Sequence, residues 1–497
     1  MISITLAEIA AAVDGALSLP TGIAADTEIS GTVQTDSRLV GPGSIFFALP
    51  GETTDGHLFA PAAVDAGAAL LIVERTLELD VAQVVVPNGV DALGALARTV
   101  VSRVRAAGGL RVVGITGSNG KTTTKNLLRA ILEKHGATVA PHGSFNNQVG
   151  APISMLEVDD ETRFLIVEAG AGGPGEVAKI ASFAQPDVAV VLKVGLAHAG
   201  VFGTLEATRL AKAELVTGLP PSAVAILNAD DDRVASMASM TSARIVSFGL
   251  DERADFHAED LRATATGTSF VLVADGQRRE VRLRILGEHH VMNAVAAIAA
   301  AHELSVPLDD AITAIEAVPR AERWRMESLR SPSGAVVIND AYNASPDSTA
   351  AALKTLAQIV TQDQRSIAVL GEMAELGDVS DEEHDRIGRL VVRLNIQKLV
   401  VVGHRARHIH NAAGLEGSWN GESVLVGSAD EAYDLLRDDL REGDVVLVKS
   451  SKSAGLRFLG DRLGAHSTGA HSTGAHSTDA HSTGAHSTGD GSAGASS

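Results

Sequence analysis

Apolar, β-branched runs alternate with stretches of helical spacing through the middle of the chain, from about residue 109 to 319. Such alternation predicts a mainly parallel β-sheet with helices on both of its faces. The helical spacing is clearest after residue 120, where Leu127, Leu128, Ile131 and Leu132 recur on one side. The expected strands are 111–115, 164–167, 188–192 and 223–227.

A different pattern follows at 255–286, where polar and apolar residues alternate one by one. This period of two predicts an antiparallel annex to the central sheet. From about residue 320 the alternation of strands and helices resumes, which predicts a C-terminal, Rossmann-like α/β domain. Its expected strands are 336–339, 367–370, 399–402 and 445–448.

Residues 1–108 mix short strands and helices with turn residues such as Gly41-Pro42-Gly43. The run Arg105-Ala106-Ala107-Gly108-Gly109 indicates a joint before the first central strand. We therefore expect an α/β protein with a small N-terminal α/β domain, a central parallel-sheet domain with its annex, a C-terminal domain and a tail. The expected boundaries are 1–108, 109–319, 320–463 and 464–497.

The tail after Leu463 repeats Ala-His-Ser-Thr with a period of five residues. It holds no apolar residue larger than alanine, so burial cannot offset the entropy of ordering, and we expect disorder. The repeated histidines suggest weak metal binding as an alternative. A period of five spreads them around a helix instead of collecting them on one face, which favours an inert tail.

Composition narrows the class of protein. The chain has 497 residues, 45% of them hydrophobic, which is enough for about two to four domains with cores. A net charge of −20 argues against nucleic-acid binding, and the lack of cysteine excludes disulfides and thiol catalysis. The sequence contains neither a signal segment nor a run that could span a bilayer, so we expect a cytoplasmic protein. We also expect the protein to be a monomer.

The segment from Gly114 to Thr124 carries the most specific chemistry in the chain. It reads GITGSNGKTTT, a glycine-rich turn between an expected strand and an expected helix. Backbone N–H groups, the helix dipole and the Lys121 ammonium can cradle phosphate oxygens, and the Thr122 hydroxyl can ligate Mg²⁺. The spacing departs from the strict Walker pattern, which has a glycine where Ile115 stands. A glycine-rich surface turn with an exposed lysine is the alternative, but the coincidence of strand, turn and helix favours binding of ATP.

Three further polar residues are candidates for the same site. Glu168 follows the expected strand 164–167 and His198 follows the next one, and ligands bind at the carboxyl ends of parallel strands. A carboxylate there can hold Mg²⁺ beside Thr122. Lys212, in an expected helix, is the third candidate. Each of the three has a plain structural alternative: a solvated glutamate for Glu168, a structural histidine for His198, and a solvated helix face for Lys212.

Several motifs resemble one enzyme family. The run 116–123 (TGSNGKTT) looks like the phosphate loop of the Mur ligases and of the related folylpolyglutamate synthases. The resemblance extends from about residue 30 to about residue 455. The motifs 35–38 (TDSR), 42–48 (PGSIFFA) and 55–57 (DGH) are similar to the UDP-binding domain of the later muramyl-peptide ligases, which folylpolyglutamate synthases lack.

Two further motifs indicate a branch of the family. Residues 144–150 (SFNNQVG) match an NNxxG turn, and residues 340–346 (DAYNASP) resemble a YNANP signature; both are typical of the ligases that add D-alanyl-D-alanine. The diamino-acid-adding branch is the runner-up, but its Asp-Asn-Pro-Arg motif is missing from the sequence. A nucleotide-binding regulatory protein without catalysis is the alternative of another class, and the joint presence of the loop with Glu168, His198 and Lys212 argues against it.

The resemblance implies an ATP-dependent amide ligase that joins D-alanyl-D-alanine to UDP-N-acetylmuramoyl-tripeptide through an acyl phosphate. It also assigns roles. Lys121, His198 and Lys212 would be catalytic, with a carbamate on Lys212. Asn293 would contact adenine, Arg325 the phosphates and Asp340 the ribose. The remaining nucleotide contacts would come from Gly117, Ser118, Asn119, Gly120, Lys121, Thr122 and Thr123. The Mg²⁺ ligands would be Thr122, Glu168, His198 and Lys212. The substrates would contact Ser37, Arg38, Asn146, Asn147, Tyr342 and Asn343. Ser345 and Pro346 lie in the signature turn without an assigned contact.

Two departures from the family pattern bear on substrate recognition. After Glu168 the chain reads AGAGG at 169–173, where many relatives have a Met and an Asn-His pair, so those side-chain contacts are absent. Residues 449–453 (KSSKS) carry lysine where relatives often have an arginine for the D-alanyl-D-alanine carboxylate. The third residue of the peptide substrate is left open among meso-diaminopimelate, lysine and another diamino acid.

Overall fold

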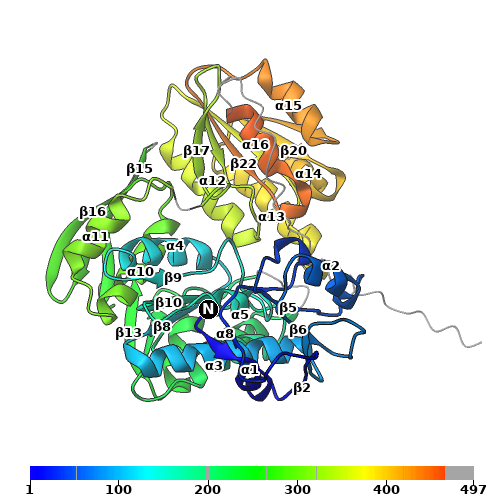
Figure 1. Ribbon diagram of the computed structural model, residues 1–497. Helices are drawn as coiled ribbons and strands as arrows, with labels where there is room; N and C mark the ends of the chain where they lie inside the picture. Colours follow the sequence, from blue (N-terminus) through cyan, green and yellow to red (C-terminus); the bar gives the residue numbers. More distant parts are fainter. Residues whose placement is uncertain (52, 197–201, 265, 321, 418, 465–497) are drawn as a thin grey trace, which may run out of the picture.

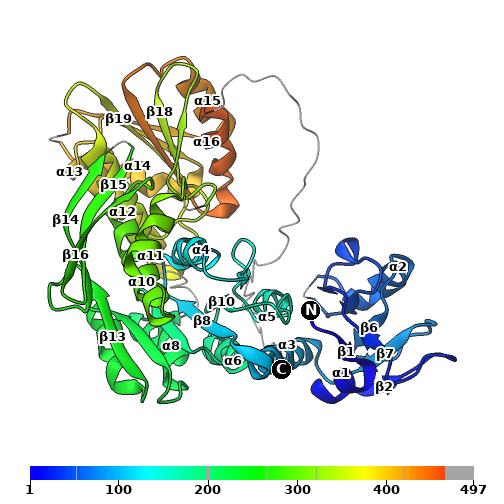
Figure 2. The same cartoon turned by 60° about the vertical axis from the view of Figure 1, so that its left-hand side comes forward.

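The computed structural model describes residues 1–51, 53–196, 202–264, 266–320, 322–417 and 419–464. Within these residues three sheets are covered by helices, which confirms the predicted α/β class. Figures 1 and 2 show the C-terminal part stacked on the central part, with the N-terminal part beside the central one. None of the helices in the described ranges combines the length and the apolar character needed to cross a bilayer.

The N-terminal part is built on a five-stranded sheet in the order β2-β7-β6-β5-β4, parallel except for β2. A separate antiparallel pair joins β1 to β3. The strands are β1 Ile4–Thr5, β2 Ala16–Ser18, β3 Glu28–Ile29, β4 Val33–Gln34, β5 Ile45–Phe47, β6 Leu70–Val73 and β7 Ala82–Val85. The helices are α1 Leu6–Ala12, η1 Ser37–Leu39, η2 Gly56–Phe59, α2 Ala60–Asp65 and α3 Gly89–Gly108.

Helix α3 connects the N-terminal and central parts and packs on both of them. It contacts α1 on one side and α5 (Gly150–Met155) and α6 (Glu176–Ala184) on the other. One continuous apolar core therefore runs from the N-terminal sheet through α3 into the central part. The boundary that the sequence predicts at residue 108 falls at the end of α3, but the two parts share their packing there.

The central sheet has nine strands in the order β16-β15-β14-β13-β12-β11-β8-β10-β9. The seven strands β8 to β14 run parallel to one another. Strands β14, β15 and β16 pair antiparallel and form the annex that the sequence predicts. The strands are β8 Arg111–Thr116, β9 Thr138–Val139, β10 Phe164–Glu168, β11 Val188–Val191, β12 Val224–Asn228, β13 Arg244–Gly249, β14 Phe256–Thr264, β15 Gly267–Ala274 and β16 Gln277–Leu283.

Two layers of helices enclose this sheet. Helices α4, α10 and α11 share one core with one face of the sheet, while α3, α5, α6 and α8 belong to the core on the other face. The additional central helices are α4 Lys121–Leu132, α8 Leu205–Thr217, α9 Asp232–Ala235, η3 Ser236–Met240, α10 His289–Glu303 and α11 Leu308–Glu316.

The C-terminal sheet has six strands in the order β17-β18-β22-β19-β20-β21, parallel except for β17. Its strands are β17 Glu327–Arg330, β18 Val336–Asn339, β19 Arg365–Leu370, β20 Lys398–Val402, β21 Glu422–Val426 and β22 Asp444–Lys449. Its helices are α12 Pro346–Ile359, η4 Gly377–Val379, α13 Ser380–Arg393, η5 His404–Ala406, α14 Arg407–Leu415, α15 Ala429–Arg437, η6 Lys452–Ala454 and α16 Leu456–Gly464. The predicted boundary at residue 320 lies between α11 and β17.

Candidate active site

The predicted phosphate loop connects β8 to the first turn of α4. Gly117 and Gly120 both have positive φ angles, +154° and +89°, and Gly120 is the residue before the helix. A Cβ atom on Gly120 would lie 2.3 Å from Oδ1 of Asn293, so a side chain would clash there. The two glycines therefore bring the backbone close to α10 and leave the N–H groups at the start of α4 free to face a phosphate.

Lys121 lies at the start of α4 and turns back over the loop. Its Nζ donates to the carbonyl oxygen of Gly117 at 2.7 Å. Burial lowers the pKa of Lys121; the charge of Glu168 opposes this shift and that of Arg325 adds to it. Two cationic groups and one carboxylate thus converge on the loop, an arrangement that can neutralise a polyphosphate.

The loop residues between the glycines are held by neighbouring segments. The N–H of Ser118 donates to Lys193 O at 2.8 Å, and its hydroxyl accepts from Gly195 N at 2.9 Å. Asn119 accepts from the hydroxyl of Ser345 at 3.2 Å, so the signature turn of the C-terminal part touches the loop. Sequence reasoning assigned no contact to Ser345, which also caps α12.

Glu168 and Thr122 lie together beneath the loop. Glu168 is only 1% exposed, and its Oε1 accepts from Asn146 Nδ2 at 2.9 Å and from Thr122 Oγ1 at 3.4 Å. Its Oε2 is buried and has no hydrogen-bond partner in the described part of the chain. A buried carboxylate oxygen without a partner beside a hydroxyl fits a small divalent cation such as Mg²⁺.

These protein oxygens would be only part of a metal's ligand shell. Among the described residues no group of three or more His, Asp or Glu side chains gathers around one point. Mg²⁺ characteristically keeps water and phosphate oxygens as ligands, so two protein ligands fit such an ion. His198, expected near a second ion, lies outside the described residues.

Lys212 lies on α8 with its side chain buried at 2% exposure, not on a solvated helix face. Burial lowers its pKa to about 7, the positive charge of Lys121 adds to this shift, and the charges of Glu214 and Glu176 oppose it. A large share of this amine is therefore neutral near pH 7, and a neutral amine is the form that reacts with electrophiles.

Asn293 faces the other side of the loop from α10. Its Oδ1 accepts from Thr124 Oγ1 at 3.4 Å, and its Nδ2 lies 3.2 Å from Nδ1 of His290. The rings of His289 and His290 lie 4.1 Å apart, and burial lowers the pKa of His289 to about 4. Burial also lowers the pKa of His290, so both rings are neutral near pH 7.

Arg325 reaches the loop from the C-terminal part. Its Nη2 lies 3.3 Å from Thr122 Oγ1, and its guanidinium stacks on the Tyr342 ring at 4.4 Å. The Tyr342 hydroxyl in turn lies 2.9 Å from the hydroxyl of Ser144 in the central part. The structure therefore brings Arg325 and Tyr342 to the loop.

Asp340 follows β18 and is occupied by protein partners. Its Oδ2 lies 2.6 Å from Nζ of Lys449, and its Oδ1 accepts from Met326 N at 3.1 Å. The adjacent Asn343 has its Oδ1 bonded to Ala344 N at 2.9 Å. Lys449 is named in the sequence analysis only for the D-alanyl-D-alanine carboxylate. Its ion pair with Asp340, 109 residues away in the chain, was not expected.

The other expected substrate contacts are divided between two places. Asn146 joins Glu168, whereas Asn147 accepts from Val149 N and Gly150 N where α5 begins. Ser37 and Arg38 lie on the N-terminal part, where the largely exposed Arg38 pairs with Asp36 at 2.6 Å. No hydrogen bond or ion pair connects Ser37 or Arg38 with the phosphate loop within the described ranges.

Lys125, which holds the segment before Ser144, is a residue of the site that was not expected from the sequence. It is 1% exposed, and its Nζ donates to Pro141 O at 2.7 Å and to Gly143 O at 2.8 Å. It lies three and seven residues before Leu128 and Leu132, so its place on the buried side of the helix was visible in the spacing.

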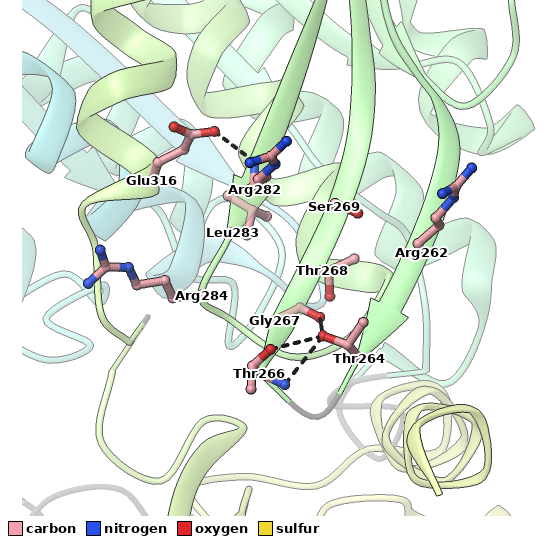
Figure 3. Close-up of a pocket in the computed structure, with 10 residues that line it drawn as sticks. All are labelled: Arg262, Thr264, Thr266, Gly267, Thr268, Ser269, Arg282, Leu283, Arg284 and Glu316. Atoms are coloured by element: carbon pink, nitrogen blue, oxygen red, sulfur yellow. Dashed lines mark hydrogen bonds between the residues drawn. The ribbon is translucent and has the colours of Figure 1, made fainter. Parts of the chain in front are cut away.

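A separate cavity of about 400 Å³ lies on the annex, away from the phosphate loop (Figure 3). Arg262, Arg282 and Arg284 line it from β14 and from the end of β16, and Glu316 accepts from the backbone N–H of Arg282 at 2.8 Å. It includes none of the site residues expected from the sequence.

The chain belongs to the Mur ligase family. Residues 31–111 match the model described as "Mur ligase family, catalytic domain", residues 115–301 the Mur ligase middle domain, and residues 324–452 "Mur ligase, glutamate ligase domain". These three matches agree with the predicted three-domain architecture.

Particular relatives are similar along almost their whole length. The UDP-N-acetylmuramoyl-tripeptide–D-alanyl-D-alanine ligase of Mycobacterium tuberculosis (strain ATCC 25618 / H37Rv) is 43% identical, covering 94% of this chain and 99% of its own. The enzyme of that name from Escherichia coli (strain K12) is 33% identical over 92% and 97%. Among solved structures, MurF from Acinetobacter baumannii superposes with a TM-score of 0.84 at 32% identity, covering 93% and 99%. MurF ligase from Thermotoga maritima in complex with ADP has a TM-score of 0.77 at 27% identity, covering 87% and 98%.

Proposed function

We propose that the protein is an ATP-dependent ligase that joins D-alanyl-D-alanine to UDP-N-acetylmuramoyl-tripeptide, giving UDP-N-acetylmuramoyl-pentapeptide, ADP and phosphate. The observation that carries this proposal is the meeting of the phosphate loop, Glu168 and Arg325 at one point between two domains. The names of the similar mycobacterial and Escherichia coli enzymes support the choice of substrates. The product would serve peptidoglycan synthesis, and thereby cell shape and division.

Amide formation in water needs an activated carboxyl group, because a carboxylate is a poor acylating agent. The terminal carboxylate of the tripeptide attacks the γ-phosphorus of ATP; the bond to ADP breaks and an acyl phosphate forms. The amine of D-alanyl-D-alanine then attacks the acyl carbon, loses a proton and expels inorganic phosphate. Lys121 and the N–H groups at the start of α4 would stabilise the charge on the transferred phosphoryl group.

Binding of Mg²⁺ is part of the proposal. Thr122 and Glu168 would hold one ion, since Glu168 offers a buried oxygen without a partner. When bound, such an ion reduces the repulsion between the triphosphate and the attacking carboxylate. His198 and a carbamate on Lys212 are proposed for a second ion, and the low pKa of Lys212 supports carbamate formation because CO₂ reacts with a neutral amine.

The nucleotide is proposed to lie between α4 and the C-terminal domain. Loop residues 117–123 would contact the phosphates, with Arg325 approaching from the C-terminal domain. Asn293 would contact adenine beside the neighbouring rings of His289 and His290. Asp340, proposed for the ribose, would have to share its carboxylate with Lys449.

The muramyl substrate is proposed to span the N-terminal and central domains. Ser37 and Arg38 would bind its UDP end, which the exposure of Arg38 permits. Asn146, Asn147 and Asn343 are proposed around the reacting peptide ends, where their side chains also have protein partners. Because the reaction consumes ATP, we propose a cytoplasmic enzyme, and we propose that it works as a monomer.

A product assay tests the proposal. The protein is incubated with ATP, Mg²⁺, D-alanyl-D-alanine and UDP-muramyl tripeptides that carry either meso-diaminopimelate or lysine, and the products are weighed by mass spectrometry. We expect pentapeptide product and phosphate release that depends on both peptide substrates. Lys121→Ala should lower turnover by about 100-fold or more, whereas Lys134→Ala, which removes an exposed lysine just after α4, should not. Wild-type turnover in Lys121→Ala, or product only from a dipeptide substrate with a free diamino acid, would defeat the proposal.

A further inference from the structure

We propose that Tyr342 is a positioning residue that holds Arg325 against Thr122 when the C-terminal domain docks on the central domain. This inference rests on the proposed ligase function and deepens it. It gives Tyr342 a role that acts through Arg325, in place of the direct substrate contact expected from the sequence.

The Tyr342 side chain makes two contacts, one through its ring and one through its hydroxyl group. The ring carries the Arg325 guanidinium at 4.4 Å, and the hydroxyl lies 2.9 Å from Ser144 Oγ, 198 residues earlier in the chain. Because Ser144 belongs to the central domain, this hydroxyl contact exists only while the two domains are docked.

The backbone on both sides of Arg325 has an uncommon conformation. Trp324 and Met326, its two neighbours, have φ angles of +59° and +50°, in the left-handed region that residues with side chains seldom adopt. Such backbone persists only where its surroundings hold it. Here Tyr342 N donates to Trp324 O at 3.1 Å and Met326 N donates to Asp340 at 3.1 Å. The turn that carries Tyr342 therefore also fixes the segment that carries Arg325.

The segment that leads to Ser144 is held by Lys125. Lys125 lies on α4, one turn after Thr122, and is almost completely buried. Its ammonium group bonds to the carbonyl oxygens of Pro141 and Gly143, at 2.7 and 2.8 Å. The segment that ends at Ser144 is thereby tied to the helix that begins at the phosphate loop.

These contacts close a ring that crosses the domain joint twice. It runs from α4 through Lys125 to Ser144, across to Tyr342 and Arg325, and back to Thr122 on α4. A further bridge, from Asn126 Nδ2 to Glu322 Oε2 at 2.9 Å, joins α4 to the segment that carries Arg325. Docking of the C-terminal domain and placement of Arg325 beside Thr122 are therefore one event, and Tyr342 is the residue that couples them.

The test compares Tyr342→Phe, Ser144→Ala and the double variant in the ligation assay with saturating substrates. Each single variant removes the same hydroxyl contact, so each should lower kcat by about 2- to 10-fold, with the KM for D-alanyl-D-alanine unchanged. The double variant should be no slower than the slower single variant, because no second contact remains to be lost. Tyr342→Ala, which also removes the ring under Arg325, should be at least about 3-fold slower than Tyr342→Phe.

Tyr433→Phe is the matched control, because Tyr433 also carries an arginine, Arg462, over its ring at 4.0 Å but lies on α15. It should behave like the wild type. Direct substrate binding by Tyr342 would instead raise the KM for D-alanyl-D-alanine in Tyr342→Phe and leave Ser144→Ala unaffected, and this result would overturn the inference. Wild-type kcat in both single variants, or multiplying losses in the double variant, would overturn it as well. A wild-type protein without ligase activity would refute the proposed function itself, so the two failures are distinguishable.

Discussion

The Lys449 ammonium and the Asp340 carboxylate form a buried ion pair at the carboxyl ends of two neighbouring parallel strands. Nζ of Lys449 lies 2.6 Å from Oδ2 of Asp340, and the side chains are 2% and 13% exposed. Lys449 Nζ also donates to the carbonyl oxygen of Asn343 at 3.0 Å. This one lysine therefore holds the start of the signature turn from the end of β22.

Lys449→Met should destabilise the protein, because it leaves the Asp340 carboxylate largely buried without its charge partner. Removal of one member of a buried pair typically costs about 3–5 kcal/mol, and the partial exposure of Asp340 favours the lower end. Denaturant unfolding measures the loss. Lys354→Met, at an exposed position of α12, is the control and should unfold like the wild type. Equal stability of the two variants would contradict the role given to the pair.

Gly120→Ala should abolish nucleotide binding while the domain stays folded. The alanine must adopt φ near +89°, which costs about 1–2 kcal/mol, and its Cβ would meet Asn293 Oδ1 at 2.3 Å. Gly175→Ala is the matched control, since Gly175 has φ +83° and precedes α6 but no atom lies within 4 Å of its added Cβ. Calorimetric titration with ADP should show binding only in the control. Normal affinity in Gly120→Ala would mean that the loop does not bind the nucleotide.

Lys212→Met should change how stability depends on pH. Burial holds the pKa of Lys212 at about 7, against 10.5 for a free side chain, so between these values the unfolded chain binds one more proton than the folded protein. The wild type should therefore gain stability as pH rises from 7 to 10, by up to about 1.4 kcal/mol per unit from this residue. The variant should lack this contribution.

Denaturant unfolding at pH 7, 8 and 9 in buffers free of CO₂ measures the difference. Lys134→Met, which removes an exposed lysine, should keep the wild-type slope. A difference between Lys212→Met and the wild type that does not vary with pH would show that the buried amine titrates normally. Activity should be lost in Lys212→Met at every pH if this residue has the proposed catalytic role.

Glu168→Gln should raise the Mg²⁺ concentration that half-maximal activity requires, by about 10-fold or more. The amide keeps the size of the side chain but removes the charge of its buried, unpartnered oxygen. Chelation with EDTA should stop phosphate release in both proteins, and added Mg²⁺ should restore it at a lower concentration in the wild type. Glu303→Gln, at the end of α10 and paired with Arg244, is the control. Equal Mg²⁺ requirements would exclude Glu168 as a ligand.

Truncation after Leu463 should leave turnover unchanged at saturating ATP and Mg²⁺. The repeat that follows has no side chain able to form a core, and the expected sites all precede it. The ligation assay, run on the full and the shortened chain, measures this. A lower kcat in the shortened chain would mean that the repeat takes part in the reaction.

Several parallel strands inside the two large sheets could be predicted because they are buried on both faces. The runs predicted at 164–167, 336–339 and 367–370 lie in β10, β18 and β19, since continuous β-branched apolar residues have few other places in a folded chain. Strand β21 was not predicted, because it is the edge strand and most of its residues are half-exposed.

The candidate site was predictable only as far as local sequence encodes it. The loop from 117 to 120 is a local motif, and its strand, turn and helix follow from neighbouring residues. The contacts of Ser144 with Tyr342 and of Lys449 with Asp340 join residues 198 and 109 positions apart. No periodicity in the chain marks such pairs, because they arise from the docking of strands and domains.

The protein has only two tryptophans, and one of them, Trp324, lies next to Arg325 at the joint. Its indole N–H points to Asp461 at 3.0–3.1 Å, while Trp419 bonds to Ile396 O inside the C-terminal domain. A chain so poor in aromatic residues therefore carries one intrinsic fluorophore next to Arg325 and a second one inside the C-terminal domain as an internal reference. If docking of the C-terminal domain on the central domain changes the surroundings of Trp324, the emission spectrum of the protein itself reports it, without any attached dye.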